Sequence, residues 1–160
     1  MLMFFHGLES GPHGAKYQLL SEAFGEVNSP DFQGMDLEQR LAHAEEITRG
    51  AAGLTIVGSS FGGLVAALLY AQVPDRIHAL VLLAPALHRD IADAVPALPP
   101  HTVVIHGTHD DVVPLDEVRA FCQSRGVEVI EVDDGHRLLG SMPLVIEKVR
   151  SILPSDRVSP

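Results

Sequence analysis

The sequence predicts a three-layer α/β/α sandwich built on a mainly parallel sheet of about six strands. Short apolar runs alternate with stretches of helical spacing along the 160 residues, the order expected of strands joined by crossover helices. Several runs, such as Ile77 to Leu83, are almost continuously apolar, which is typical of strands buried on both faces of a parallel sheet. The length suits one domain over residues 1–153, followed by a short polar tail at 154–160.

The first half of the chain is expected to alternate between strands and helices three times. The expected elements are a strand over 1–5, a helix over 14–24, a strand over 26–32, a helix over 37–49, a strand over 54–57 and a helix over 61–72. The helix over 37–49 is amphipathic, because Leu37, Leu41 and Ala44 recur at helical spacing. Pro30 restricts the strand over 26–32 to an edge or an end.

The second half repeats the alternation around one irregular excursion. The expected elements are a strand over 77–83, an excursion over 85–100 with at most one short helix, a strand over 102–105, a helix over 115–124, a strand over 127–132 and a helix over 140–153. In such sheets, ligands bind at the carboxyl ends of the strands, around a reversal in strand order. A functional site is therefore expected in the loops that follow strands.

Composition and charge exclude several functional classes. The formal net charge of −10 disfavours nucleic acid and anionic membrane surfaces as partners. No apolar run reaches the roughly 18–20 residues that span a bilayer, and no basic region precedes the apolar N-terminus, so a signal peptide is not expected. The single cysteine, Cys122, allows no internal disulfide and is expected to be a buried structural thiol. These features predict a cytoplasmic protein.

One motif, within the segment from Thr55 to Ala67, points to a nucleophile. Gly58, Ser60 and Gly62 match the pattern G-x-S-x-G, in which a strand turns sharply into a helix and holds the central serine in a strained conformation. The chain is expected to pass too close at both flanking positions for a side chain, hence the two glycines. Ser59 lacks glycines at this spacing and is the poorer candidate.

A serine hydroxyl needs a base, and two later loops supply candidates. His136 lies after the last expected strand and Asp110 after the strand over 102–105. An imidazole can accept the serine proton, and a carboxylate can fix its tautomer. Ser60, Asp110 and His136 therefore form the candidate catalytic triad. Asp111 is the near alternative to Asp110, unless it caps the following helix, and the carboxylates at 133–134 are remote alternatives.

The remaining histidines are assigned to other roles. His6 and His106 each precede a glycine at a strand end and are expected to hold their loops by a hydrogen bond. His109 is a candidate for the mouth of the site. None of the nine histidines shows a metal-ligand spacing, so neither a metal nor a cofactor is expected.

Three motifs in this order resemble the α/β-hydrolase family, in particular its small cap-less bacterial esterases of the YqiA kind. The opening Phe5-His6-Gly7, with Ser10-Gly11-Pro12 and Lys16, is similar to the start of those esterases. The segment from His106 to Pro114 resembles the family's acid loop, and the segment from Asp133 to Leu138 resembles its histidine loop. The resemblance covers the chain from Phe4 to about Leu153.

The resemblance implies an oxyanion hole and a reduced fold. Its two donors would be the backbone N–H groups of Phe61 and Leu8, and Gly7 is expected to let the backbone approach closely. The family's usual sheet has two further strands before the His-Gly strand, so this chain is expected to form a reduced α/β-hydrolase fold with room for a homodimer. Since the excursion over 85–100 is too short for a lid, a shallow, open site is expected.

The sequence thus predicts a serine hydrolase that cleaves small carboxylic esters or thioesters through an acyl-enzyme. Leu87 and Leu138 are candidates for substrate binding, although ordinary core packing explains them equally well. Coenzyme A would require basic residues at the rim, where the candidates are Lys16, Arg89 and Arg137. The alternatives are a non-catalytic binding protein on the same fold and a peptidase or amidase.

Overall fold

The structure is a computed structural model that describes residues 1–154, without the side chains at positions 89 and 92. The tail predicted at 154–160 therefore lies, except for its first residue, outside the described residues, as does the side chain of the candidate cation Arg89.

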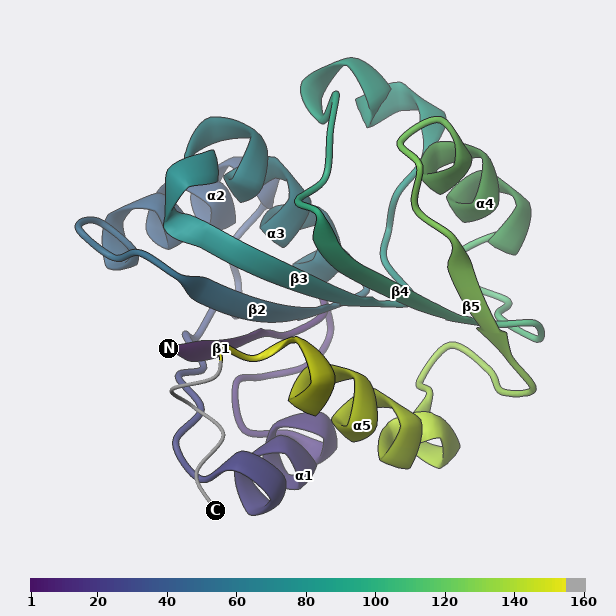
Figure 1. The fold of residues 1–160 in the computed structure, drawn as a ribbon, viewed down its shortest axis with the longest axis horizontal. Helices are drawn as coiled ribbons and strands as arrows, with labels where there is room; N and C mark the ends of the chain where they lie inside the picture. Colours follow the sequence, from purple (N-terminus) through teal and green to yellow (C-terminus); the bar gives the residue numbers. More distant parts are fainter. Residues whose placement is uncertain (155–160) are drawn as a thin grey trace.

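A parallel sheet of five strands forms the middle layer (Figure 1). Its strands are β1 (Leu2–Phe5), β2 (Leu54–Ser59), β3 (Ile77–Leu83), β4 (His101–Gly107) and β5 (Val129–Val132), which lie side by side in chain order. The register pairs Phe5 with Gly58 and Gly107 with Val132. The carboxyl ends of the strands therefore meet at one edge of the sheet.

Helices cover both faces of the sheet, which confirms the three-layer prediction (Figure 1). One face carries α2 (Leu37–Ile47), α3 (Phe61–Gln72) and α4 (Leu115–Gln123), and the other carries α1 (Ala15–Phe24) and α5 (Met142–Ile152). Short 3₁₀ turns complete the chain at η1 (Pro74–Arg76), η2 (Arg89–Ala94) and η3 (Leu139–Ser141). The excursion over 85–100 thus contains one short turn of helix, as predicted.

The sheet has five strands rather than about six, because the strand predicted over 26–32 does not form. Only an isolated parallel bridge joins Asn28 to Met3, with hydrogen bonds from the Phe4 N–H to Asn28 O and from the Asn28 N–H to Leu2 O, both 2.9 Å. Pro30 has no N–H to extend the ladder. Asn28 nevertheless lies on the side of β1 that faces away from β2. After β1 the chain therefore passes outward to Asn28 and then returns past β1 to form β2.

Two apolar cores flank the sheet and account for the continuous apolar runs in the sequence. Every residue of β2 is buried, and β3 is buried except for a half-buried His78. Cys122 packs in the core on the α3 side, where burial raises the pKa of its thiol to about 11, consistent with the predicted structural thiol. No helix in residues 1–154 is both long and apolar enough to cross a membrane.

Candidate active site

Loops that follow the parallel strands line one pocket of about 920 Å³, a volume typical of small-molecule sites. The loop after β1 contributes Leu8, the turn after β2 contributes Ser60 and Phe61, and the loop after β5 contributes His136. The pocket lies at the carboxyl ends of the strands beside β1, where the chain passes outward to Asn28 before it returns to β2. It is thus at the place where ligands bind in sheets of this class.

Ser60 occupies a strained turn between β2 and α3, as the sequence predicts. Its φ of 54° and ψ of −114° are unusual for a non-glycine residue, and its N–H donates to Leu83 O at 2.9 Å. A Cβ atom on Gly62 would overlap the Phe5 carbonyl, and one on Gly58 would overlap the start of α3. Both glycines are therefore required by close backbone approach.

The predicted nucleophile, base and acid lie in one hydrogen-bonded chain. His136 Nε2 is 3.0 Å from Ser60 Oγ, and His136 Nδ1 is 2.8 Å from Asp110 Oδ2. Because a carboxylate only accepts, Nδ1 carries the proton and Nε2 is left to accept the serine proton. This is the arrangement that activates a serine in the known triads.

The side chain of Asp110 is completely buried, and its two oxygens meet four hydrogen-bond donors or close contacts. Its Oδ1 accepts the Val112 and Val113 N–H groups, both at 2.8 Å, and its Oδ2 accepts from His136 and lies 3.2 Å from His106 Nε2. Burial acts to raise the pKa of Asp110, but the hydrogen bonds from Val113, His136 and Val112 outweigh it and lower the pKa. The carboxylate is therefore held ionised beside the imidazole.

His106 holds its loop by a hydrogen bond, the role expected from the sequence, and it also faces the acid. The ring is buried, and its Nε2 donates to Val113 O at 2.9 Å. Its Nδ1 is buried without a partner among the described residues. The proton therefore lies on Nε2, between a carbonyl and the Asp110 carboxylate.

The near alternative for the acid, Asp111, is exposed and does not cap a helix. The N-cap of α4 is Pro114, and no side chain bonds to it. The helix-cap expectation is therefore wrong. Asp110 takes the N–H groups of Val112 and Val113, because its loop folds back over its own carboxylate.

The two remote alternatives for the acid have other partners: Asp134 bonds within the histidine loop, and Asp133 lies on the surface. Asp134 accepts from the Gly135 N–H and from Ser141 Oγ, both at 2.8 Å. Exposed Asp133 pairs with exposed His109 at 2.6 Å. Neither carboxylate bonds to His136, and His109 does not line the pocket in the described part of the chain.

The two candidate oxyanion donors, the N–H groups of Leu8 and Phe61, belong to residues that line the pocket with Ser60. Phe61 is the first residue of α3, where backbone N–H groups lack intrahelical acceptors. In the described part of the chain, neither N–H donates a hydrogen bond. Both groups are therefore free to bind a ligand oxygen.

Of the two candidate substrate-binding leucines, one lines the pocket and the other does not. Leu87 lines the pocket while its side chain is buried. The substrate-binding role predicted for Leu138 is wrong, because this side chain is completely buried in the core between the sheet and α5 and does not line the pocket. Its left-handed conformation, with φ 56° and ψ 22°, precedes η3, and the next residue, Leu139, lines the pocket instead.

Charged side chains also line the pocket, and they are of both signs. Lys16 and Arg137 lie on its wall, as do Glu9 and Glu117. Burial, followed by the charge of Arg137, lowers the pKa of Lys16. Within the described residues, no group of three or more His, Cys, Asp or Glu side chains is placed to hold a metal ion.

Sequence reasoning missed one buried charge beside this site, Arg40 of α2. It lies three residues after Leu37 and four before Ala44, so it shares their apolar helix face. A cation on the apolar face of an amphipathic helix is the signal that could have identified it.

The sequence matches the family described as the alpha/beta hydrolase fold over residues 27–103. An alpha/beta-superfamily protein from Xanthomonas campestris pv. campestris is 30% identical, with a TM-score of 0.80 over 95% of each chain. Est1E from Butyrivibrio proteoclasticus is 19% identical, with a TM-score of 0.76 over 99% of this chain and 88% of that chain. Paleococcus ferrophilus monoacylglycerol lipase is 16% identical, with a TM-score of 0.73 over 94% and 93%.

A search of the curated proteins by sequence finds no match. The 30% identity over almost all of both chains goes beyond a shared fold. The chain belongs to the α/β-hydrolase family.

Proposed function

We propose that the protein is a serine hydrolase that cleaves carboxylic esters or thioesters through an acyl-enzyme. The observation that carries the proposal is the continuous chain from Ser60 through His136 to buried Asp110, with the serine at the wall of a pocket. Such a chain has no evident structural purpose at a strained turn, whereas it is what a hydroxyl needs to act as a nucleophile.

In the proposed reaction, Ser60 Oγ attacks the carbonyl carbon while its proton passes to His136 Nε2. The carbonyl oxygen becomes an oxyanion that the Leu8 and Phe61 N–H groups bind. The tetrahedral intermediate collapses, and His136 protonates the leaving alcohol or thiol. Water then attacks the acyl-enzyme and gives its proton to His136, and the acid leaves as Ser60 regains its proton.

We expect esters rather than peptides as substrates. The excursion over 85–100, where larger relatives insert a lid, contains only η2, and a site without a cap offers little to grip a polypeptide. One protein with this fold is a monoacylglycerol lipase, and another, Est1E, is seen with ferulic acid bound. Both observations favour a small acyl substrate.

The thioester variant has a specific observation in its favour. Lys16 and Arg137 lie on the pocket wall and could face an anionic leaving group such as coenzyme A, while Glu9 and Glu117 on the same wall oppose this. Comparing an acyl-CoA with the uncharged thioester of the same acyl chain distinguishes the two. A lower KM for acyl-CoA, lost in Lys16→Ala, would assign the cations to the leaving group.

Nitrophenyl esters of increasing acyl length test the activity itself. The wild type is expected to hydrolyse the short esters, and Ser60→Ala to reduce kcat by about 10⁴-fold or more. Ser59→Ala is the matched control and is expected to retain activity, because Ser59 also lines the pocket but it is Ser60 whose hydroxyl is hydrogen-bonded to His136. Absence of ester and thioester hydrolysis by folded wild type would favour the binding protein, and preference for aminoacyl amides would favour the amidase.

A further inference from the structure

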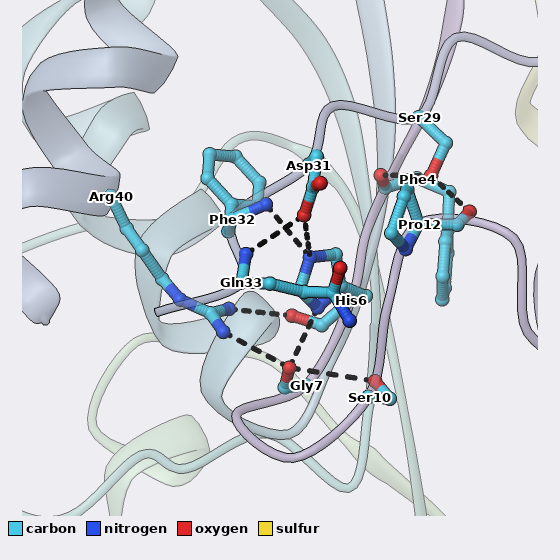
Figure 2. Close-up of polar contacts among 10 residues, drawn as sticks. All are labelled: Phe4, His6, Gly7, Ser10, Pro12, Ser29, Asp31, Phe32, Gln33 and Arg40. Carbon is cyan, nitrogen blue, oxygen red and sulfur yellow. Dashed lines mark hydrogen bonds and ion pairs between the residues drawn. The ribbon is translucent and has the colours of Figure 1, made fainter. Parts of the chain in front are cut away.

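Arg40 is a cation with no exposed surface, and its guanidinium group points at the loop after β1 (Figure 2). Its Nη1 donates to His6 O at 2.8 Å, and its Nη2 donates to Gly7 O at 3.0 Å. The guanidinium carbon also lies over the Phe61 ring, 4.9 Å from its centroid. One side chain of α2 thus contacts both segments that supply the candidate oxyanion donors.

The Gly7 carbonyl is held from three sides (Figure 2). Besides Arg40, it accepts from His6 Nδ1 at 2.7 Å and from Ser10 Oγ at 3.4 Å. His6 Nε2 accepts the Phe32 N–H at 2.9 Å, so the ring proton lies on Nδ1 and points at Gly7 O. Burial lowers the pKa of His6, which favours this neutral form.

The direction of this carbonyl sets the direction of the Leu8 N–H. The carbonyl of Gly7 and the N–H of Leu8 belong to one peptide group, and no peptide bond among the described residues is cis. In a trans peptide the two groups point in opposite directions. Holding Gly7 O against Arg40 therefore turns the Leu8 N–H away from α2, and Leu8 lines the pocket with Ser60.

The environment of Arg40 argues against a purely structural role. No ion pair joins it to a carboxylate within residues 1–154, and its Nε is buried without a partner among them. Burial lowers its pKa, and the charge of Asp31 partly opposes this, but a guanidinium stays protonated. Since an unpaired buried charge is costly, an apolar side chain would serve packing better at this position.

We propose that Arg40 is a positioning residue that orients and polarises the Gly7–Leu8 peptide, so that its N–H binds the oxyanion of the acylation step. The proposal rests on the proposed serine hydrolase activity. A cation bound to the carbonyl end of a peptide strengthens the N–H at the other end as a donor, because hydrogen bonds in series polarise one another. Its charge also acts on the developing oxyanion through low-dielectric surroundings.

The test compares Arg40→Met with Arg76→Met. Arg76 is a matched control because it too is an arginine of low exposure that binds a carbonyl: it donates to Glu45 O at 2.8 Å and to Thr48 Oγ1 at 3.1 Å at the far end of α2. It does not line the pocket. Both variants lose hydrogen bonds that are at least partly buried, and Arg76→Met also loses an ion pair with Glu45, but only Arg40→Met loses contact with the oxyanion loop.

Arg40→Met is expected to lower kcat by about 10- to 100-fold, less than deletion of a donor, with KM little changed. Arg76→Met is expected to lower the thermal midpoint and to leave kcat of the folded enzyme unchanged. A kcat of Arg40→Met no lower than that of Arg76→Met, or a loss confined to KM, would overturn the proposal. Failure of the wild type to hydrolyse any ester would instead refute the proposed function.

Inhibition by a trifluoromethyl ketone distinguishes weakened oxyanion binding from a general loss of folded structure. Ser60 Oγ adds to its carbonyl carbon, the serine proton passes to His136, and the ketone oxygen becomes the anion in the hole. Its inhibition constant should rise in Arg40→Met by about the same factor as kcat/KM falls, as expected for an analogue of the transition state. An unchanged inhibition constant would contradict the proposal.

Arg40→Lys provides a decision if the methionine variant does not fold. Lysine keeps the charge but lacks the planar fork that reaches two carbonyls at once. A kcat below that of the wild type, with weakened trifluoromethyl ketone inhibition, is expected. Wild-type kcat and inhibition in Arg40→Lys would show that the fork does not position the peptide.

Discussion

The same dipeptide, His-Gly, occurs at the ends of two strands of this molecule. A buried positive charge lies beside one copy, and a buried negative charge lies beside the other. His6-Gly7 directly follows β1 and His106-Gly107 ends β4, and both histidine side chains are completely buried. The first pair lies against the guanidinium of Arg40. The second lies against the carboxylate of Asp110, 3.2 Å from His106 Nε2.

The difference matches the charges that the proposed reaction would create. Negative charge would develop on the carbonyl oxygen near the β1 loop, and positive charge on His136 beside the β4 loop. The buried cation Arg40 lies against the β1 loop, and the buried anion Asp110 lies against His136. The two loops thus illustrate how similar backbone motifs acquire opposite electrostatic roles from one neighbouring side chain each.

The largest expected effect comes from removing the buried anion. Asp110→Asn keeps the shape but cannot hold the His136 tautomer, so kcat should fall by about 10⁴-fold. Asp111→Asn is the matched control, since Asp111 is exposed and the carboxylate paired with His136 is that of Asp110. Its kcat should stay within about twofold of the wild type. Equal losses in the two variants would remove the distinction between these carboxylates.

The glycines of the two dipeptides should differ in tolerance. A Cβ on Gly107 would overlap the Asp134 carbonyl, whereas one on Gly7 would meet its nearest atom, Ser10 Oγ, at 3.6 Å. The expectation that Gly7 permits a close backbone approach is therefore wrong, whereas the backbone does approach closely at Gly107. Gly107→Ala should lower the free energy of unfolding by about 1–3 kcal/mol, and Gly7→Ala by less than about 1 kcal/mol. Urea denaturation of both variants measures this, and equal losses would contradict the contrast.

The smallest expected effect is a pH dependence of stability from His6. Burial lowers its pKa in the folded state below 6.5, so the unfolded chain binds more protons at acidic pH and the free energy of unfolding falls as the pH drops below about 6.5. The loss continues until the folded-state pKa is reached. His6→Gln should flatten this slope in denaturation measured between pH 7.5 and pH 5. A slope unchanged by the substitution would show that His6 does not titrate as inferred.

The sequence predicted the layers and the Ser60, Asp110 and His136 loops because that information is local. Apolar runs define the strands, and the turn between β2 and α3 requires glycines at both flanking positions for reasons of close approach. Once the strands are parallel, the loops after them must meet at one edge. No knowledge of long-range packing is needed for this step.

The errors came from features that packing decides. The segment over 26–32 has strand-like composition but makes one bridge only, and Leu138 turns into the core while Leu139 lines the pocket. Arg40 was passed over because its partners are backbone carbonyls 33 and 34 positions away in the chain. The apolar helix face could therefore have marked Arg40 as buried, but the spacing of residue types carries no pattern that identifies carbonyl partners.

The most direct test of an activated serine is labelling with a tagged fluorophosphonate. Ser60 Oγ should displace fluoride from phosphorus, and mass spectrometry should locate the label on Ser60 of the wild type and find none on Ser60→Ala. Label on another serine, or none on folded wild type, would contradict the catalytic assembly of Ser60, His136 and Asp110 and favour a binding role for the pocket.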